Sequence, residues 1–319
     1  GDFSKIYGGI FIDEAQQLED EWKIALYSML DENKYMIMVG DYNQEIRPKN
    51  KEEYEENDDL IILEDDKKDD NIYYLGEIEF RRIVLNKNYR NTIQITNGIN
   101  RLIRQLEKYK KDFKFKEKKN NKNLLLGIAT RNGEEPEYIY AMDTNILKEK
   151  IKEKIHYLIN EKGIEQEEII LLYPPNFTDN EESKIYNNKT CGKLSKSIIE
   201  KIIKNELNLE LNDLTDGLSK INEHGIKLST TGKAIGLDFK AVIIFGLYNI
   251  RASRYNNIEF NNIATIKDAN NDIKKEVINN MKNIYVAASR AREFLYIIDD
   301  IDGTTKNIIS EYAKKIGEK

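Results

Sequence analysis

The chain opens with an apolar run that stops at two carboxylates. Residues 7–12 read Tyr-Gly-Gly-Ile-Phe-Ile, and Asp13 and Glu14 follow directly. An uninterrupted apolar run of this length is typical of a strand buried on both faces of a parallel sheet. A helix-compatible spacing of apolar residues follows over 18–30, and a second apolar run covers 35–39. The pattern predicts a β-α-β unit with both carboxylates at the carboxyl end of its first strand, where ligands bind in open α/β sheets.

The rest of the chain continues this alternation. Short apolar runs predict strands at 83–85, 124–129, 169–173, 241–246 and 294–298. Amphipathic spacing predicts helices at 93–106, 145–162, 197–207 and 276–292. Strands that alternate with helices over 319 residues predict an α/β fold of about two domains, with parallel sheets flanked by helices.

Composition narrows the class of protein. Hydrophobic residues make up 40% and charged residues 33% of the chain, and no apolar run approaches the length of a membrane span. We therefore expect a globular protein with no membrane partner. The single cysteine, Cys191, excludes a disulfide framework and predicts a reducing, cytoplasmic location. With only His156 and His224 beside it, far apart in sequence, no zinc site is expected. The net charge of −6 argues against coating nucleic acid by bulk charge, but it allows a local basic groove.

Asp13 and Glu14 suit the hydrolysis of a nucleoside triphosphate. The first carboxylate can hold Mg²⁺, mostly through water, and the second can orient or deprotonate the attacking water. Gln44 follows the second apolar run, so its neutral amide is expected at the same edge of the sheet. The alternative is a strand that simply ends in a solvated acidic turn.

Five segments, in order along the chain, resemble motifs II to VI of superfamily 1 helicases of the UvrD/Rep type. They are Asp13-Glu-Ala-Gln16, Gly40-Asp-x-x-Gln44, 85–92, 228–239 and 284–293. The resemblance implies RecA-like α/β domains, one incomplete and one complete. Residues 1–82 would form the C-terminal part of the first motor domain. Residues 83–319 would form the second, with a reduced insertion around 174–224. The implied activity is that of an ATP-dependent DNA helicase or translocase that moves 3′ to 5′ on single-stranded DNA, with RNA not excluded.

The resemblance also assigns roles to single residues. Arg90 and Arg290 would meet charge on the γ-phosphate, which suits a forked guanidinium that is always charged. Tyr89 would stack on the adenine. The alternatives without a catalytic role are a surface arginine beside a core tyrosine for Arg90, and a structural salt bridge for Arg290. The predicted site contains Glu14, Gln44, Arg90 and Arg290 as catalytic residues, Asp13, Tyr89, Gly236 and Asp238 as ATP-binding residues, and Asp13 with Glu14 as Mg²⁺ ligands.

The chain carries no phosphate-cradling P-loop. The pattern Gly-x-x-x-x-Gly-Lys-Ser/Thr is absent, because the Gly-Lys pairs at 192–193 and 232–233 are followed by Leu and Ala. We therefore expect the P-loop in a segment N-terminal to these residues in the same protein, and expect this chain alone to be inactive. The rival hypothesis is a helicase-like nucleic-acid-binding or regulatory subunit that truly lacks a P-loop.

A basic stretch at 108–122 contains eight lysines, with Phe113 and Phe115 between them. Basic residues interleaved with aromatics can follow a nucleic-acid backbone and stack on bases. The same composition is found in solvated helix ends and loops. Both interpretations stay open at this stage.

Overall fold

The computed structural model describes residues 6–41, 72–83, 85, 87–113, 127–141, 143–173, 196–215, 217–247, 267–268, 271–299 and 308–318. The chain divides into two compact units. Unit 1 comprises Gly1–Asn86 with Lys116–Asn123, and unit 2 comprises Lys87–Phe115 with Leu124–Lys319. Each unit has its own sheet.

Unit 1 begins with the predicted β-α-β unit, which is confirmed. Strand β1 (Tyr7–Ile12) is followed by the short 3₁₀ helix η1 (Ala15–Gln17), helix α1 (Asp20–Ser28) and strand β2 (Leu30–Met38). β1 and β2 pair in parallel, with Gly9 opposite Tyr35 and Phe11 opposite Ile37. The antiparallel pair β3 (Ile72–Leu75) and β4 (Ile78–Arg81) also belongs to this unit.

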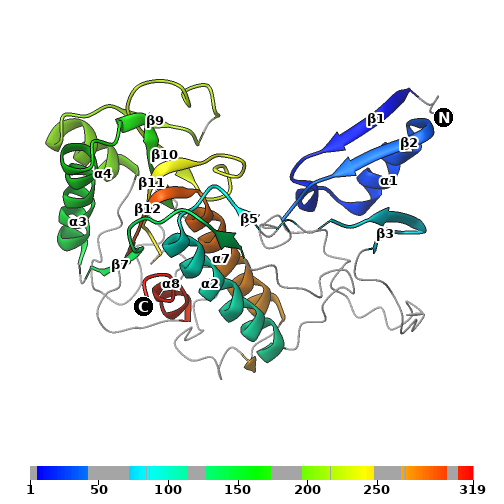
Figure 1. The fold of residues 1–319 in the computed structure, drawn as a ribbon. Helices are drawn as coiled ribbons and strands as arrows, with labels where there is room; N and C mark the ends of the chain where they lie inside the picture. The colour runs from blue at the N-terminus through cyan, green and yellow to red at the C-terminus, as the bar shows by residue number, and fades with distance from the viewer. Residues whose placement is uncertain are drawn as a thin grey trace. The chain divides into compact units, whose positions relative to one another are not determined.

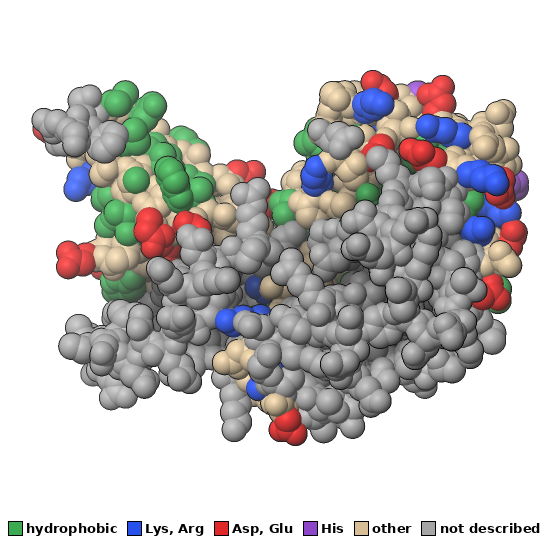
Figure 2. Space-filling model, turned by 180° about the vertical axis from the view of Figure 1, so that it is seen from behind, with side chains coloured by type: hydrophobic (Ala, Val, Ile, Leu, Met, Phe, Trp, Pro, Cys, Tyr) green, Lys and Arg blue, Asp and Glu red, His purple; other side chains and the backbone are tan. Residues whose placement is uncertain are grey.

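The prediction that β1 is buried on both faces is wrong. Phe11 is 72% exposed and Tyr35 is 56% exposed, and their rings contact each other edge to face at 6.1 Å. Side chains alternate between the faces of a strand, so Phe11, Tyr35 and Ile37 share one face. Within the described residues no layer covers that face, and burial of a parallel sheet requires a layer on each side. Figure 2 shows hydrophobic side chains gathered on the surface of this unit.

Unit 2 is built around a six-stranded parallel sheet. Its strand order is β7 (Glu137–Tyr140), β12 (Ala291–Asp299), β11 (Phe239–Ile244), β8 (Ile169–Tyr173), β10 (Ile226–Thr230) and β9 (Leu211–Asp213). Strands β8 and β11 are buried, and the apolar runs at 169–173 and 241–246 predicted both of them. Strand β10 is also buried, although its sequence, Ile-Lys-Leu-Ser-Thr, contains polar residues and was not predicted as a strand. The predicted α/β class is confirmed.

Helices cover both faces of this sheet (Figure 1). On one face, α3 (Thr144–His156) continues as a π-turn over Tyr157–Glu161, and α4 (Lys196–Lys201) continues as one over Ile202–Glu206. Both helices share a hydrophobic core with alternate residues of the central strands, including Ile169, Leu171 and Ile243. On the other face, α2 (Ile93–Asp112) and α7 (Asn271–Ser289) lie side by side.

Local signals in the sequence explain where these helices begin. Thr92 caps α2, since its hydroxyl accepts a hydrogen bond from the backbone N–H of Ile95. Asp143 caps α3 in the same way, through two backbone N–H groups. The C-terminal helix α8 (Ile308–Lys314) is held against α2 by Arg101, whose guanidinium donates to the carbonyls of Lys315 and Ile316, both at 2.7 Å.

Three boundaries differ from the predictions. Helix α7 ends at Ser289, so Arg290 lies in a turn and Arg292 lies in β12. Ile83 and Leu85 are 74% and 80% exposed and lie outside any strand, because no neighbouring strand pairs with them in the described residues. Strand β5 starts instead at Lys87 (Lys87–Asn88) and pairs with β6 (Ile128–Ala129), the described remnant of the strand predicted at 124–129.

Other predicted features lie partly outside the described residues. Gln44 is one of them, and residues 174–195 of the predicted insertion are others. Residues 196–213 form α4 and β9, which belong to the core and sheet of unit 2. None of the described helices is long and apolar enough to cross a membrane.

Candidate functional site

In unit 1, Asp13 and Glu14 lie directly beyond the carboxyl end of β1, as predicted. One carboxylate oxygen of Asp13 accepts the backbone N–H of Glu14 at 2.8 Å. Glu14 has φ of 51°, in the left-handed region that residues other than glycine rarely adopt. Such a conformation costs on the order of 1 kcal/mol and must be held by its surroundings.

Gln16 and Gly40 hold this turn. The Gln16 amide, 2% exposed, donates to the Glu14 carboxylate at 2.6 Å and accepts the backbone N–H of Asp41 at 3.1 Å. A Cβ atom at Gly40 would lie 2.4 Å from the Gln16 amide oxygen, so only glycine fits there without a shift. The two segments that resemble motifs II and III therefore meet through Gln16.

The carboxylates of Asp13 and Glu14 fit a magnesium site in which the protein supplies only one or two of the ligands. Mg²⁺ often takes one or two protein carboxylates and completes its shell with water and phosphate oxygens. Among the described residues there is no cluster of three or more side chains that could hold a metal by themselves. Asp13 is exposed. Its Oδ1 already accepts a hydrogen bond, so its Oδ2 would be the atom that binds the ion or its water.

In unit 2, Tyr89 and Arg90 stand on the loop between β5 and α2. Tyr89 is 75% exposed, which excludes the alternative of a core tyrosine. Arg90 is also exposed, and its guanidinium makes no hydrogen bond or ion pair with any described residue. Both side chains are open to a ligand.

Arg290 differs from Arg90 because its side chain is 1% exposed and fully engaged. Its guanidinium donates to the carbonyls of Val286 (3.1 Å) and Leu237 (3.2 Å) and to the hydroxyl of Ser289 (2.8 Å). These three acceptors are neutral oxygen atoms. Arg290 joins the end of α7 to the segment that precedes β11, and any contact with a phosphate would require it to give up these bonds.

The predicted ATP-binding residues of the motif V-like segment lie close to the same turn. Gly236 has φ of +80°, which explains the need for glycine at this position. The Asp238 carboxylate lies 3.5 Å from the Arg292 guanidinium, which also pairs with Glu168. Arg292 therefore competes with the ribose hydroxyl that was predicted for Asp238.

The site in unit 2 lies at the amino ends of the strands. Glu168, Asp238 and Arg290 each come directly before a strand, β8, β11 and β12 respectively. Ligands of open α/β sheets usually bind at the opposite edge, formed by the carboxyl ends of the strands. In unit 1, Asp13 lies at that carboxyl edge. The structure thus brings together Tyr89, Arg90, Gly236, Asp238 and Arg290 in unit 2, and Asp13 and Glu14 in unit 1.

Sequence reasoning missed two side chains that hold this site. Asn91 and Arg131 bond backbone groups on both sides of it. Asn91 lies within the motif-like segment 85–92, but its partners lie about 200 positions away in the chain, so the sequence does not indicate this role.

The structure describes the first six residues, 108–113, of the basic stretch 108–122. Phe113 is 4% exposed and stacks on Tyr109, with ring centroids 6.0 Å apart, so the proposed stacking of Phe113 on a base is wrong. Lys108 and Lys111 are exposed. Phe115 lies outside the described residues.

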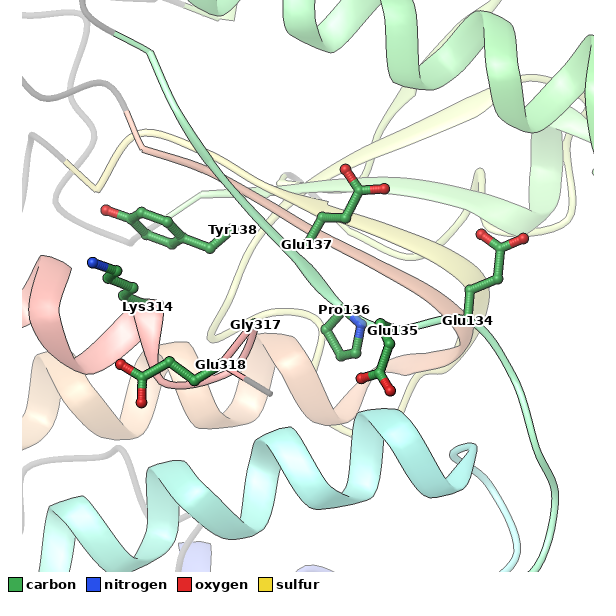
Figure 3. A pocket seen from close by; sticks show the side chains of 8 residues that line it. All are labelled: Glu134, Glu135, Pro136, Glu137, Tyr138, Lys314, Gly317 and Glu318. Carbon is green, nitrogen blue, oxygen red and sulfur yellow. The ribbon is translucent and has the colours of Figure 1, made fainter.

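A pocket of about 560 Å³ lies elsewhere on unit 2, between the start of β7 and the end of α8 (Figure 3). No predicted site residue lines it. Three of its carboxylates are already paired: Glu134 with Lys162, Glu137 with Lys154 and Glu318 with Lys315. These ion pairs explain the local charge without a ligand.

Residues 176–300 match the family model described as the UvrD-like helicase C-terminal domain. The predicted resemblance to UvrD-type helicases is confirmed. This UvrD-like region contains the segments 228–239 and 284–293, which carry Gly236, Asp238 and Arg290. The match suggests a DNA helicase role for this region.

No curated protein matches the sequence. Among solved structures, the C-terminal domain of a possible DNA helicase from Lactobacillus plantarum WCFS1 is similar, with 12% sequence identity and a TM-score of 0.40. The similarity covers 71% of this chain and 94% of that one. At this TM-score the similarity supports no argument about function.

Proposed function

We propose that this chain is part of an ATP-dependent helicase or translocase that moves 3′ to 5′ on single-stranded DNA in the cytoplasm. Unit 2 would act as the second motor domain and unit 1 as part of the first. Asp13 and Glu14 would hold Mg²⁺, and Glu14 with Gln44 would orient the attacking water. The ion would offset charge on the β- and γ-phosphates when bound.

The observation that carries this proposal is the assembly of three distant segments in unit 2. Tyr89 and Arg90, Gly236 and Asp238, and Arg290 come from three separate parts of the sequence and meet at the amino ends of β11 and β12. An exposed aromatic ring and an exposed guanidinium on the same loop suit a base and a phosphate respectively. The UvrD-like region includes two of these three segments.

The rival proposal is a regulatory or nucleic-acid-binding subunit. One observation favours it: the Arg290 guanidinium is buried and donates hydrogen bonds to Val286, Leu237 and Ser289 of its own unit. Finding a P-loop upstream of residue 1 in the full-length reading frame would favour the motor. Its Lys and backbone N–H groups would supply a phosphate cradle, and the P-loop pattern is absent from residues 1–319.

The test is nucleotide binding to this chain, followed with a fluorescent ATP analogue in the presence of Mg²⁺. We expect weak binding that Tyr89→Ala and Arg90→Ala weaken further. Tyr140→Ala is the matched control, because Tyr140 is another exposed tyrosine of unit 2, 43% exposed, that has no predicted role. Equal effects of the Tyr89 and Tyr140 substitutions would show that the nucleotide site is misplaced.

Hydrolysis separates the two proposals further. We expect this chain alone to show almost no ATPase activity with or without single-stranded DNA, because it lacks the P-loop. Turnover at ordinary helicase rates from this chain would refute that expectation. DNA-stimulated ATP turnover by the full-length protein supports the motor, and its absence supports the regulatory subunit.

A further inference from the structure

The Asn91 side chain bonds the backbone on both sides of Arg290. Its amide nitrogen donates to the carbonyl of Ser289 at 3.2 Å and to the carbonyl of Ala291 at 2.5 Å. Its amide oxygen accepts a hydrogen bond from the Asn88 amide at 2.7 Å. Asn91 is only 3% exposed, so water cannot easily replace these partners.

The same network fixes the loop that carries Arg90. The Asn88 amide oxygen accepts the backbone N–H groups of Arg90 and Asn91, at 3.0 and 3.1 Å. Arg131 makes a second link, since its guanidinium donates to the carbonyl of Arg90 at 2.8 Å and to that of Arg292 at 3.2 Å. The backbone around Arg90 and the backbone around Arg290 are therefore joined through side chains at two places.

We propose that Asn91 is a positioning residue that fixes the Arg90 loop and the Arg290 turn relative to each other, so that both arginines are presented from one rigid frame. Its catalytic meaning rests on the proposed function. The chemistry selects an amide here: two N–H donors meet two carbonyls, and one oxygen meets an N–H. Aspartate would bring a second acceptor against those carbonyls, and alanine would leave both without a donor.

Asn100, on helix α2, offers a matched control for Asn91, which lies in the loop just before that helix. It is 7% exposed, and its amide also bonds the backbone twice, to the carbonyl of Gly127 at 2.9 Å and the N–H of Gly127 at 3.0 Å. These bonds hold the start of β6 and do not reach Arg290. Asn91→Ala and Asn100→Ala thus remove similar side chains with similar partners, but only the first loosens the Arg290 turn.

The first arm of the experiment needs no nucleotide. Hydrogen exchange is measured on uniformly ¹⁵N-labelled protein at the Arg290 Nε–H, and at the Phe239 amide, which donates to the Arg290 carbonyl. We expect exchange about tenfold faster in Asn91→Ala than in Asn100→Ala, because one or two net hydrogen bonds are lost at the turn. Equal exchange in both variants would overturn the proposal. Asn91→Ser is the milder second variant, to be used if Asn91→Ala does not fold, with the same expected order.

The second arm adds Mg²⁺ and ATP and follows the Nε resonances of Arg90 and Arg290. In the wild-type chain we expect both to shift at the same nucleotide concentration, and in Asn91→Ala we expect Arg290 to stop following Arg90. If both still shift together in the variant, the positioning role is wrong. If neither shifts in the wild type while exchange still depends on Asn91, the positioning role stands and the proposed function fails.

Discussion

Arg290 allows the sharpest test of whether a predicted catalytic arginine is also a structural one. We expect Arg290→Ala to lower the stability of this chain strongly, whereas Arg90→Ala leaves it almost unchanged. The two residues were given the same role by resemblance, but Arg290 is 1% exposed and Arg90 is exposed.

The expected size of the effect follows from the contacts. In Arg290→Ala the carbonyls of Val286 and Leu237 and the hydroxyl of Ser289 lose a charged donor. Hydrogen bonds to a charged group contribute about 1.5–3 kcal/mol each. The cost of burying the guanidinium offsets part of that sum, so we expect a net loss of about 3 kcal/mol. For a domain of this size that corresponds to a fall in Tm of roughly 6–12 °C.

Urea and thermal denaturation of this chain give the measurement, with Arg90→Ala as the control. An exposed side chain without partners among the described residues should change stability by less than about 0.5 kcal/mol. Arg290→Lys should recover only part of the loss, because one ammonium cannot donate to both carbonyls from the position of the fork. If Arg290→Ala melts within about 2 °C of the wild type, the buried bonds contribute little and the structural role is refuted.

Placed in a full-length protein that carries a P-loop, the same variants address catalysis. If Arg290 meets the γ-phosphate in the transition state, its loss should lower kcat by about 10³–10⁵ per folded molecule. If Arg290 is structural alone, ATPase per folded molecule should be unchanged even though the Tm falls. The stability result and the activity result are independent, so each hypothesis can fail on its own.

Three other substitutions test other parts of the structure. Gly40→Ala should destabilise unit 1 by about 1–3 kcal/mol, because its Cβ would displace the Gln16 amide; unchanged melting would contradict the close approach. Burial lowers the pKa of Lys227, so the free energy of unfolding should rise as the pH increases toward the ordinary lysine pKa near 10.5. Lys227→Met should flatten this rise when the free energy of unfolding is measured by denaturation at several pH values. The same pH profile in the variant and the wild type would contradict the prediction. Phe113→Ala should cost about 3 kcal/mol of stability, because Phe113 packs on Tyr109 in the core. The same variant should leave oligonucleotide binding per folded molecule unchanged, as measured by fluorescence anisotropy. Weaker binding would show that Phe113 contributes to the contact with DNA.

The sequence predicted those parts of the fold that depend on short-range patterns. Strands β8 and β11 of unit 2 were found because residues 169–173 and 241–246 form continuous apolar runs. Helix α2 was found because its apolar residues recur at helical spacing after the cap at Thr92. The edge strands β7 and β9 were missed, since they are short and partly polar and their pairing depends on neighbours distant in sequence. Arg290 was placed at the end of a helix, but one residue beyond the true end it lies in a turn, which decides what its side chain can reach.

Burial in unit 1 could not be predicted from the apolar run alone. An apolar strand becomes buried only where another layer of structure packs on each of its faces. Gly9, Phe11, Tyr35 and Ile37 share a face by the parallel register, and that face is uncovered within the described residues. In unit 2 the same kind of run is fully buried because helices lie on both faces of the sheet. The Arg290 turn illustrates the same limit for polar groups. Its partners, Asn91 and Leu237, are specified only once the strands are in order, so the geometry of the site follows from topology and not from the motif that contains the arginine.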